Sequence, residues 1–470
     1  MKAPKWENHL ADNPKLREAI SVLSKIEKAD YEAYIVGGTP RDIILGKFDI
    51  DDIDIATNCP INILDEMFST HDIGQSRNFG IVCIRSNYKY FEIAQFRQDG
   101  EYKDGRRPED VQIVDNLQAD IERRDFTINA LALTKNGNII DYIDGISDIK
   151  SKIIRAVGDP YKRFREDFVR MIRAARFGAL EGFIIANDTY EAIRKMASYI
   201  EKVTPERIRL ELIKAAEKSG KVFAKFIILL EEFGLLKHIL PEISDLKNFP
   251  HISEFHPEGP MVWDHIIKCL EISEDVSYLS KLAILFHDIG KTRTLNYKID
   301  GNPQYYHHAK VGAKIVEDIC NRLKFSSPEK EAIAYAAENH MKWNKILEMN
   351  PSKIARMIES PYFDILINVC RVDEFSRGEK FMKKGEFKKG LNKVFEIKEK
   401  WENRIIEHKL KLVDGKRIME LTGLKPSATI GKIKEEVENE ILDNGIDPNN
   451  QEKIDELIMN AYKKRNYRYL

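Results

Sequence analysis

Two kinds of periodicity divide the chain into an α/β part and a helical remainder. Apolar residues three and four positions apart, at Leu16, Ile20, Leu23 and Ile26, predict that residues 1–30 form one helix. From residue 34 to about 157, short apolar runs between Gly, Asn and Asp turns predict strands at YIVGG (34–38), DIDIAT (52–57), IVCIRS (81–86), YFEIAQF (90–96) and NIIDYI (138–143). Helices are predicted between them at 40–45, 61–68 and 125–132.

After Pro160 the helical pattern continues to the end of the chain and strand signals largely stop. The fold class is therefore α+β, with a mixed-sheet head followed by helical domains. A length of 470 residues suits several domains. We place the boundaries at 1–160, 161–250, 251–375 and 376–470.

Composition narrows the classes of protein. Lys and Arg number 75 against 76 Asp and Glu, which excludes a basic coat over the whole surface. No apolar stretch is long enough for a membrane span, and the first residues, MKAPKWENHL, lack the apolar core of an export signal. Five scattered cysteines without a CxxC pair argue against a disulfide framework or a zinc ribbon. We therefore expect a cytoplasmic protein that is not bound to a membrane.

Two head motifs have the character of a phosphate and metal site. Gly37 and Gly38 follow an apolar strand and open a helix that carries Arg41, so backbone N–H groups there can approach a triphosphate. In a strand Asp52 and Asp54 share a face, while Ile53 and Ile55 point into the core. Two adjacent carboxylates favour a divalent cation such as Mg²⁺. The pair Asp49/Asp51 has the same spacing but lies in a loop, so we prefer Asp52/Asp54.

Two further clusters are rich in arginine. The first, RRDFTINA, places two arginines, an aspartate and an asparagine, suited to ribose and phosphate oxygens, at Arg123, Arg124, Asp125 and Asn129. The second is predicted as one helix over 163–177, with Phe164, Phe168, Met171 and Ala175 as its buried stripe. Asp167 and Arg170 would share a face of that helix. Surface ion pairs and an N-cap are the alternative interpretation of each cluster taken alone.

The motifs GGxxRD, DxD, RRDFTINA and EDxxR, in this order, resemble the class II tRNA nucleotidyltransferases, the CCA-adding enzymes. Residues 96–108 look like the flexible loop of that family, 141–158 like its hinge segment, and 205–211 like its last neck motif. The resemblance covers residues 30 to 215. It implies a nucleotidyltransferase head at 1–160, a base-recognition neck at 161–250, and tRNA, CTP and ATP as partners.

The resemblance also implies roles for individual residues. Asp52 and Asp54 would be catalytic and hold Mg²⁺, and nucleotide would be bound by Gly37, Gly38, Arg41, Arg123, Arg124, Asp125, Asn129, Asp167, Arg170, Arg173 and Arg176. Asp167 can accept from the exocyclic amine of cytosine or adenine, and Arg170 can donate to the neighbouring ring acceptor. A-adding relatives and poly(A) polymerases share most of these motifs, so addition of A alone stays open.

A second set of polar residues lies within the helical part. His265, His287, Asp288, His308, His340 and Asp373 fall on separate predicted helices and form nitrogen and oxygen ligands suited to a divalent transition metal. Residues 251–375 resemble the HD phosphohydrolase superfamily, which implies a phosphohydrolase using Ni²⁺, Co²⁺ or Mn²⁺. Residues 376–470 loosely resemble a helical, tRNA-holding tail. An RNA-binding protein with an inactive polymerase centre is the competing class, and the intact Asp52/Asp54 pair argues against it.

Overall fold

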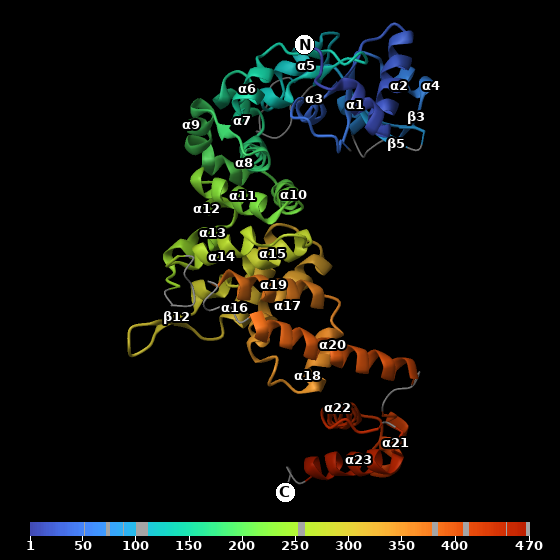
Figure 1. Cartoon of the computed structure of the whole chain (residues 1–470), viewed down its shortest axis with the longest axis vertical. Helices are drawn as coiled ribbons and strands as arrows, with labels where there is room; N and C mark the ends of the chain where they lie inside the picture. Colours follow the sequence, from blue (N-terminus) through green and yellow to red (C-terminus); the bar gives the residue numbers. More distant parts are fainter. Residues whose placement is uncertain are drawn as a thin grey trace. The chain divides into compact units, whose positions relative to one another are not determined.

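The computed structural model describes residues 1–50, 52–71, 76–87, 89–99, 111–251, 259–377, 384–407, 413–447 and 449–466 (Figure 1). The chain divides into two compact units. The first comprises residues 1–245 with 322–325, and the second comprises 246–321 with 326–470. Eleven of the thirteen strands in the described residues belong to the first unit, which confirms the prediction of a mixed-sheet head followed by helices.

A seven-stranded mixed sheet forms the core of the head. Its order is β3-β4-β5-β2-β1-β8-β9, with β2 and β5 parallel and the other neighbours antiparallel. The strands are β1 (Ala33–Val36), β2 (Asp54–Thr57), β3 (Ser69–His71), β4 (Ile81–Ser86), β5 (Lys89–Gln95), β8 (Ala132–Leu133) and β9 (Ile139–Ile140). Ile53 and Ile55 are buried, as their alternation with polar residues predicts.

Helices and two small strand pairs complete the head. The strand pairs are β6 (Arg97–Asp99) with β7 (Val111–Ile113) and β10 (Ile153–Ile154) with β11 (Ile184–Ile185). The helices are α1 (Trp6–Asp12), α2 (Pro14–Lys28), α3 (Gly38–Ile44), α4 (Ile61–Met67), α5 (Leu117–Glu122) and α6 (Gly145–Ser151), with 3₁₀ turns η1 (Ser76–Phe79) and η2 (Thr127–Asn129).

Two local predictions for the head are wrong. The helix expected within residues 1–30 is interrupted at Asn13, whose side chain accepts from Leu16 N–H and caps α2, with Pro14 at its first position. The helix expected at 125–132 is the 3₁₀ turn η2 followed by strand β8. Ala132 pairs with Val36 of β1, so this apolar segment gains its hydrogen bonds within the central sheet.

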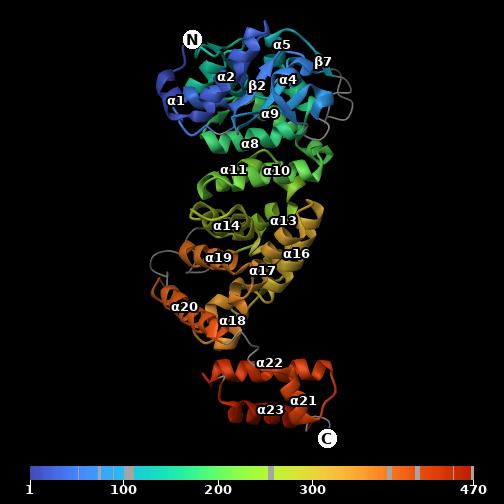
Figure 2. The same cartoon turned by 90° about the vertical axis from the view of Figure 1, so that its right-hand side faces the viewer.

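Helices after residue 160 form the neck. They are α7 (Pro160–Glu166), α8 (Val169–Glu181), α9 (Asn187–Met196), α10 (Pro205–Ala216), α11 (Gly220–Glu232), α12 (Leu236–Ile239) and α13 (Pro241–Ser244), with 3₁₀ turns η3 (Ala197–Lys202) and η4 (Asp245–Asn248). Helix α8 packs against both α10 and α11 (Figure 2). The single helix predicted over 163–177 is broken at Asp167, whose φ of −155° and ψ of 106° are extended.

In its described residues the second unit is helical apart from one hairpin. Its helices are α14 (Val262–Glu271), α15 (Tyr278–Phe286), α16 (His308–Arg322), α17 (Ser327–Asn339), α18 (Pro351–Ile358), α19 (Phe363–Ser376) and α20 (Lys384–Glu407), with 3₁₀ turns η5 (Ile289–Arg293) and η6 (His340–Lys345). The hairpin strands are β12 (Leu295–Tyr297) and β13 (Pro303–Tyr305). Helix α15 is central, because α14, α17 and α19 all pack against it.

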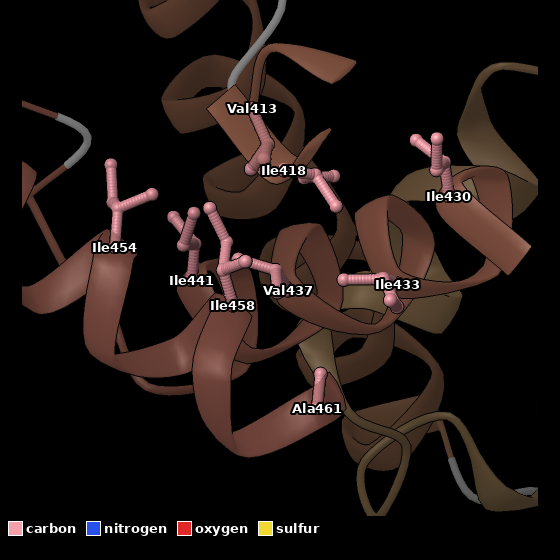
Figure 3. Close-up of a cluster of buried hydrophobic side chains, with 9 residues drawn as sticks. All are labelled: Val413, Ile418, Ile430, Ile433, Val437, Ile441, Ile454, Ile458 and Ala461. Atoms are coloured by element: carbon pink, nitrogen blue, oxygen red, sulfur yellow. The ribbon is translucent and has the colours of Figure 1, made fainter. Parts of the chain in front are cut away.

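The last helices of this unit have their own apolar core. They are α21 (Gly415–Thr422), α22 (Ala428–Asp443) and α23 (Gln451–Asn466). Figure 3 shows the core, in which Ile418, Ile433, Ile441 and Ile458 are fully buried. Apolar residues three and four apart on α22 line one side of the helix and so pack against the other two. None of the described helices is long and apolar enough to cross a bilayer.

Two candidate active sites

The turn after β1 lies against the catalytic carboxylate predicted in β2. Gly37 has a φ of +78°, and a Cβ there would come within 3.1 Å of Asp54 Oδ2 and 3.7 Å of Arg124 Nη1. Glycine suits this position because it tolerates the left-handed backbone conformation and because it has no Cβ to crowd Asp54. Asp54 begins β2, whereas Asp52 precedes the strand, so the expectation that both lie within one strand is wrong. Asp49 is exposed, and Asp51 of the alternative pair lies outside the described residues.

The carboxylates in this part of the head repel one another. The pKa of Asp54 is raised to about 6 by burial, by Asp52 and by Glu92, although Arg124 and Arg173 act in the opposite direction. Glu92 pairs in register with Asp54 across the parallel strands β2 and β5, so the two side chains share one face of the sheet. Sequence analysis missed Glu92, whose signal was its polar position between buried Phe91 and Ile93. A divalent cation suits these carboxylates because it favours their ionised forms.

A pocket of about 300 Å³ lies where the head meets the neck. Six of the predicted nucleotide-binding residues line it: Arg123, Arg124, Asp125, Asp167, Arg170 and Arg173. Helix α10 contributes Arg207, Leu210, Glu211 and Lys214, which were not among the predicted binding residues. Arg207 and Glu211 do fall in the segment 205–211 that resembles the last neck motif, so a signal was present. With five arginines and a lysine around it, the pocket suits an anionic ligand.

The break between α7 and α8 gives Asp167 its position in this pocket. Asp167 Oδ1 accepts from Val169 N–H at 3.1 Å, and Oδ2 accepts from Arg207 Nη2 at 2.5 Å. Each oxygen keeps a further lone pair, because an ionised carboxylate offers about four acceptor positions. Asp167 can therefore still accept from a ligand.

Arg170 does not pair with Asp167. Its Nη1 donates to Glu166 Oε2 at 2.7 Å and to the carbonyl of Arg163 at 2.9 Å, and its Nη2 donates to the carbonyl of Arg123 at 3.2 Å. The side-chain pair expected from their spacing is absent because the helix is interrupted at Asp167. Asp167 and Arg170 nevertheless line the same pocket.

Ion pairs hold the other arginines of the pocket. Arg173 of α8 donates through Nε to Asp125 Oδ2 at 2.7 Å. Burial alone would raise the pKa of Asp125, but Arg173 outweighs it and the pKa falls to about 2. Arg123 and Arg124 both contact the buried carboxylate of Asp120, at 2.6 and 3.0 Å. The guanidinium groups are thus positioned before any ligand binds.

Five predicted nucleotide-binding residues are not among those that line the pocket, namely Gly37, Gly38, Arg41, Asn129 and Arg176. Three of them make side-chain contacts nearby. Arg41 Nη1 donates to Asn129 Oδ1 at 2.6 Å, and both residues are buried. Arg176 donates to Glu211 at 2.6 Å and stacks on the ring of Phe177. The first contact connects α3 with η2, and the second connects α8 with α10. The three residues therefore pack beside the residues that line the pocket. Gly38 lies beside Arg41, whose Nη2 would be 3.3 Å from a Cβ at that position.

The six predicted metal-ligating residues of the helical part come together. His265 lies on α14, His287 and Asp288 follow α15, His308 begins α16, His340 follows α17, and Asp373 lies on α19. Asp288 is central: its Oδ1 is 3.3 Å from His308 Nε2 and 3.7 Å from His340 Nε2, and its Oδ2 is 3.5 Å from His287 Nε2. His265 Nε2 is 3.3 Å from Asp373 Oδ1. Two groups of three, His265/His287/Asp288 and Asp288/His308/His340, have the spacing of metal ligands.

Backbone carbonyls fix the tautomers of three of these histidines. Nδ1 of His287, His308 and His340 lies 2.8 Å from the carbonyl oxygens of Ile284, Tyr305 and Ala337 respectively. A carbonyl can only accept, so each Nδ1 carries a proton, which leaves the Nε2 atoms near Asp288 as the positions that can bind a metal ion. Burial lowers the pKa of His287 to about 4, which keeps it neutral at pH 7. Its buried Nε2 has no hydrogen-bond partner among the residues that the structure describes.

These observations fit a divalent cation. Lone pairs on Nε2 cannot donate to a carboxylate, and the pKa of Asp288, which burial alone would raise, is held well below its usual value by the charge of Lys291. Lys291 Nζ donates to Asp288 Oδ2 at 2.6 Å and contacts His251 Nε2 at 3.0 Å. Neither residue was among the predicted ligands, although Lys291 belongs to the His-Asp-x-Gly-Lys motif. Imidazole nitrogens with carboxylates suit transition metals.

Three segments of the chain match models of known domain families. Residues 33–155 match the poly A polymerase head domain. Residues 182–247 match the probable RNA- and SrmB-binding site of polymerase A, and residues 262–369 match the HD domain. The loop-like segment predicted at 96–108 lies mostly outside the described residues.

Relatives and solved structures point to the same family. The CCA-adding enzyme of Ligilactobacillus salivarius is 40% identical over 243 residues, which are 49% of this chain and 59% of that protein. The CCA-adding enzyme of Geobacillus stearothermophilus is 40% identical over 223 residues, 47% of this chain and 54% of that protein. The chain thus spans just over half the length of these relatives.

The fold is similar to that of two solved enzymes. The Bacillus stearothermophilus CCA-adding enzyme in complex with CTP has a TM-score of 0.72 at 22% identity, covering 97% of this chain and 100% of that chain. The Thermotoga maritima CCA-adding enzyme complexed with tRNA has a TM-score of 0.58 at 19% identity, covering 98% of each. The resemblance stated from the motifs is confirmed: the chain carries segments that match the poly A polymerase head domain, the probable RNA- and SrmB-binding site of polymerase A and the HD domain, and it is similar to proteins named CCA-adding enzymes.

Proposed function

We propose that this protein adds C, C and A to the 3′ ends of tRNA from CTP and ATP without a nucleic-acid template. The head (1–160) would carry out nucleotidyl transfer, the neck (161–250) would select the base, and the last part of the chain (376–470) would contact tRNA. Relatives named CCA-adding enzymes support this proposal. Because tRNA and nucleoside triphosphates are its substrates, we place the activity in the cytoplasm.

The observation that carries the proposal is Asp167 at the break between two helices, in a pocket surrounded by arginines. Cytosine and adenine both present an exocyclic amine, to which a carboxylate can accept, whereas uracil and guanine present a carbonyl there. Arg170 supplies a donor for the adjacent ring nitrogen. The carboxylate of Asp167 and the guanidinium of Arg170 can therefore recognise both C and A. Arg207 orients Asp167 by donating to its Oδ2.

Mg²⁺ would be held in the head by Asp52 and Asp54, with Glu92 contributing its charge nearby. When bound, such an ion neutralises phosphate charge and favours the attack of a hydroxyl on the α-phosphate. Gly37 leaves room beside Asp54 for the triphosphate. Arg123 and Arg124, fixed by Asp120, are available to balance the remaining phosphate charge.

A-only addition and poly(A) synthesis are the alternatives, and one experiment separates them from CCA addition. Purified protein is given Mg²⁺, CTP alone and a tRNA trimmed to the nucleotide before CCA. A CCA-adding enzyme incorporates two C residues and stops. An A-adding enzyme or a poly(A) polymerase incorporates none, and that result would contradict the proposal. Supplying ATP with a tRNA ending in CC then tests the last addition.

We further propose that the HD unit (251–375) is a metal-dependent phosphohydrolase. His265, His287, Asp288, His308, His340 and Asp373 would hold Ni²⁺, Co²⁺ or Mn²⁺. The bound cation would supply an activated water and neutralise phosphate charge. Phosphates left on damaged RNA 3′ ends are suitable substrates, since such ends lack the hydroxyl that the head requires.

The double variant His287→Ala/Asp288→Ala tests this second activity. It should lose bound metal, measured by mass spectrometry, and hydrolysis of bis(p-nitrophenyl) phosphate, while addition of CCA to intact tRNA persists. Wild-type protein without hydrolysis in the presence of any of the three metals would contradict the phosphohydrolase proposal.

A further inference from the structure

A hairpin with exposed aromatic side chains projects beside the HD-type centre. Strands β12 and β13 connect the His-Asp-x-Gly-Lys motif to His308, and Figure 1 shows the hairpin extending away from the surrounding helices. Tyr297 is 56% exposed, Tyr306 is 66% exposed, and Ile299 at the turn is fully exposed. Apolar and aromatic side chains of this size that stay exposed together on a projecting element indicate a binding surface.

The base of the hairpin is part of the metal centre. The carbonyl of Tyr305 accepts from Nδ1 of the ligand His308 at 2.8 Å. The ring of Tyr305 lies 5.6 Å from Nζ of Lys291, which donates to Asp288. A molecule that lies along the hairpin would therefore reach the six-residue metal centre at its end.

The pairing of the two strands places a second aromatic ring on the same face, further from the metal centre. Leu295 pairs with Tyr305 and Tyr297 pairs with Pro303, so Tyr305 and Tyr297 share one face of the hairpin. Tyr297 also raises the pKa of Tyr305, although burial has the larger effect, which agrees with their proximity. One face of the hairpin thus carries an aromatic ring near the metal centre and a second, exposed ring further out.

The charge of the exposed side chains indicates which kind of molecule binds the hairpin. Arg293, Lys298 and Lys310 are exposed in this segment, against one exposed acid, Asp300. Successive aromatic rings with nearby cations are the means by which proteins bind single-stranded nucleic acid, whose bases stack while its phosphates meet the cations. An apolar protein partner would not require the cations.

We propose that the β12–β13 hairpin binds the single-stranded 3′ end of an RNA and so makes polynucleotides, rather than free nucleotides, the preferred substrates of the HD-type centre. This inference rests on the proposed phosphohydrolase activity. Tyr297, which shares its face of the hairpin with Tyr305, would stack on one of the last bases, and the terminal phosphate would lie at the metal centre. The hairpin is then a specificity element and contributes nothing to hydrolysis of a small ester.

The test compares two substrates in the metal-loaded full chain. One is bis(p-nitrophenyl) phosphate, and the other is a single-stranded oligoribonucleotide ending in a 2′,3′-cyclic phosphate. The variant Tyr297→Ala should lower kcat/KM on the oligonucleotide about fivefold or more, and leave hydrolysis of the small ester unchanged. Tyr90→Ala, which removes an exposed ring from β5 of the head (53% exposed), is the matched control and should change neither. Equal loss on both substrates, or no loss on the oligonucleotide, would overturn the inference.

A second measurement does not depend on metal or hydrolysis. The same oligonucleotide, carrying 4-thiouridine at its penultimate position, is photo-crosslinked to metal-free protein, and the modified peptides are mapped by mass spectrometry. Crosslinks within residues 293–310 are expected, and crosslinks only elsewhere would overturn the inference. If wild-type protein hydrolyses neither substrate, the phosphohydrolase proposal fails while crosslinking still decides whether the hairpin binds RNA.

Discussion

Neutralising Asp125 should destabilise the unit that contains the arginine-lined pocket. Asp125 is 8% exposed and accepts from Arg173 of α8, whereas Asp125 itself belongs to the segment that precedes β8. In Asp125→Asn the Oδ1 position still accepts from Phe126 N–H, so the new amide N–H₂ faces the guanidinium of Arg173. An attractive contact between head and neck becomes a repulsive one.

The pKa of Asp125 gives the size of the effect. A shift from 3.8 to about 2 corresponds to about 2.5 kcal/mol, because each pH unit counts for about 1.4 kcal/mol. Fully buried pairs lose about 3–5 kcal/mol when one partner is removed. Arg173 keeps 30% of its side chain exposed, so we expect the lower figure. For a unit of this size that is a decrease in Tm of about 5–10 °C.

Differential scanning calorimetry of the full chain tests this value. A carboxyl whose folded-state pKa is lowered stabilises the protein above the unfolded value of 3.8, and this contribution is lost as the pH falls through about 2. The difference in Tm between wild type and Asp125→Asn should therefore stay constant from pH 8 to 5. Asp115→Asn, at an exposed position of the same unit, is the control. A decrease below 2 °C, or one that varies between pH 8 and 5, would refute the reasoning.

Three further predictions follow from the two sites. Asp54→Asn should abolish incorporation of CTP and ATP while tRNA binding in a filter assay is retained; normal turnover would redirect attention to Asp49 and Asp51. Arg170→Ala should slow addition of C and A alike and reduce discrimination against U by about 5- to 150-fold, equivalent to about 1–3 kcal/mol; unchanged discrimination would make Arg170 a helix ion pair only. Because burial lowers the pKa of His287 to about 4, metal-free protein should lose stability as the pH falls below about 6.5, where the unfolded histidine binds a proton and the buried one does not. Thermal unfolding of His287→Asn should lack this component, and an identical pH dependence would contradict the assignment.

Sequence periodicity determined which segments form the head and what they bury. Alternation placed Ile53 and Ile55 in the sheet core, and glycine after β1 marked a turn that only a residue without a side chain can occupy beside Asp54. The spaced histidines and aspartates identified six residues that the fold brings together around Asp288. Such patterns can be recognised in a sequence because alternation and turn formation depend on residues close together in the chain.

Tertiary packing decided what local patterns could not. Residues 125–132 have the apolar spacing of a helix but form a 3₁₀ turn that leads into β8, which pairs with β1 because strand partners are selected across the whole sheet. Helical spacing through 163–177 gave no sign of the break at Asp167, which Arg207 of α10 helps to hold. Glu92 acquires its role only from Asp54 on a neighbouring strand, and Lys291 also contacts His251, which lies on another segment. The sequence specifies which side chains are available, whereas charge, burial and hydrogen bonding between distant segments determine which of them come into contact.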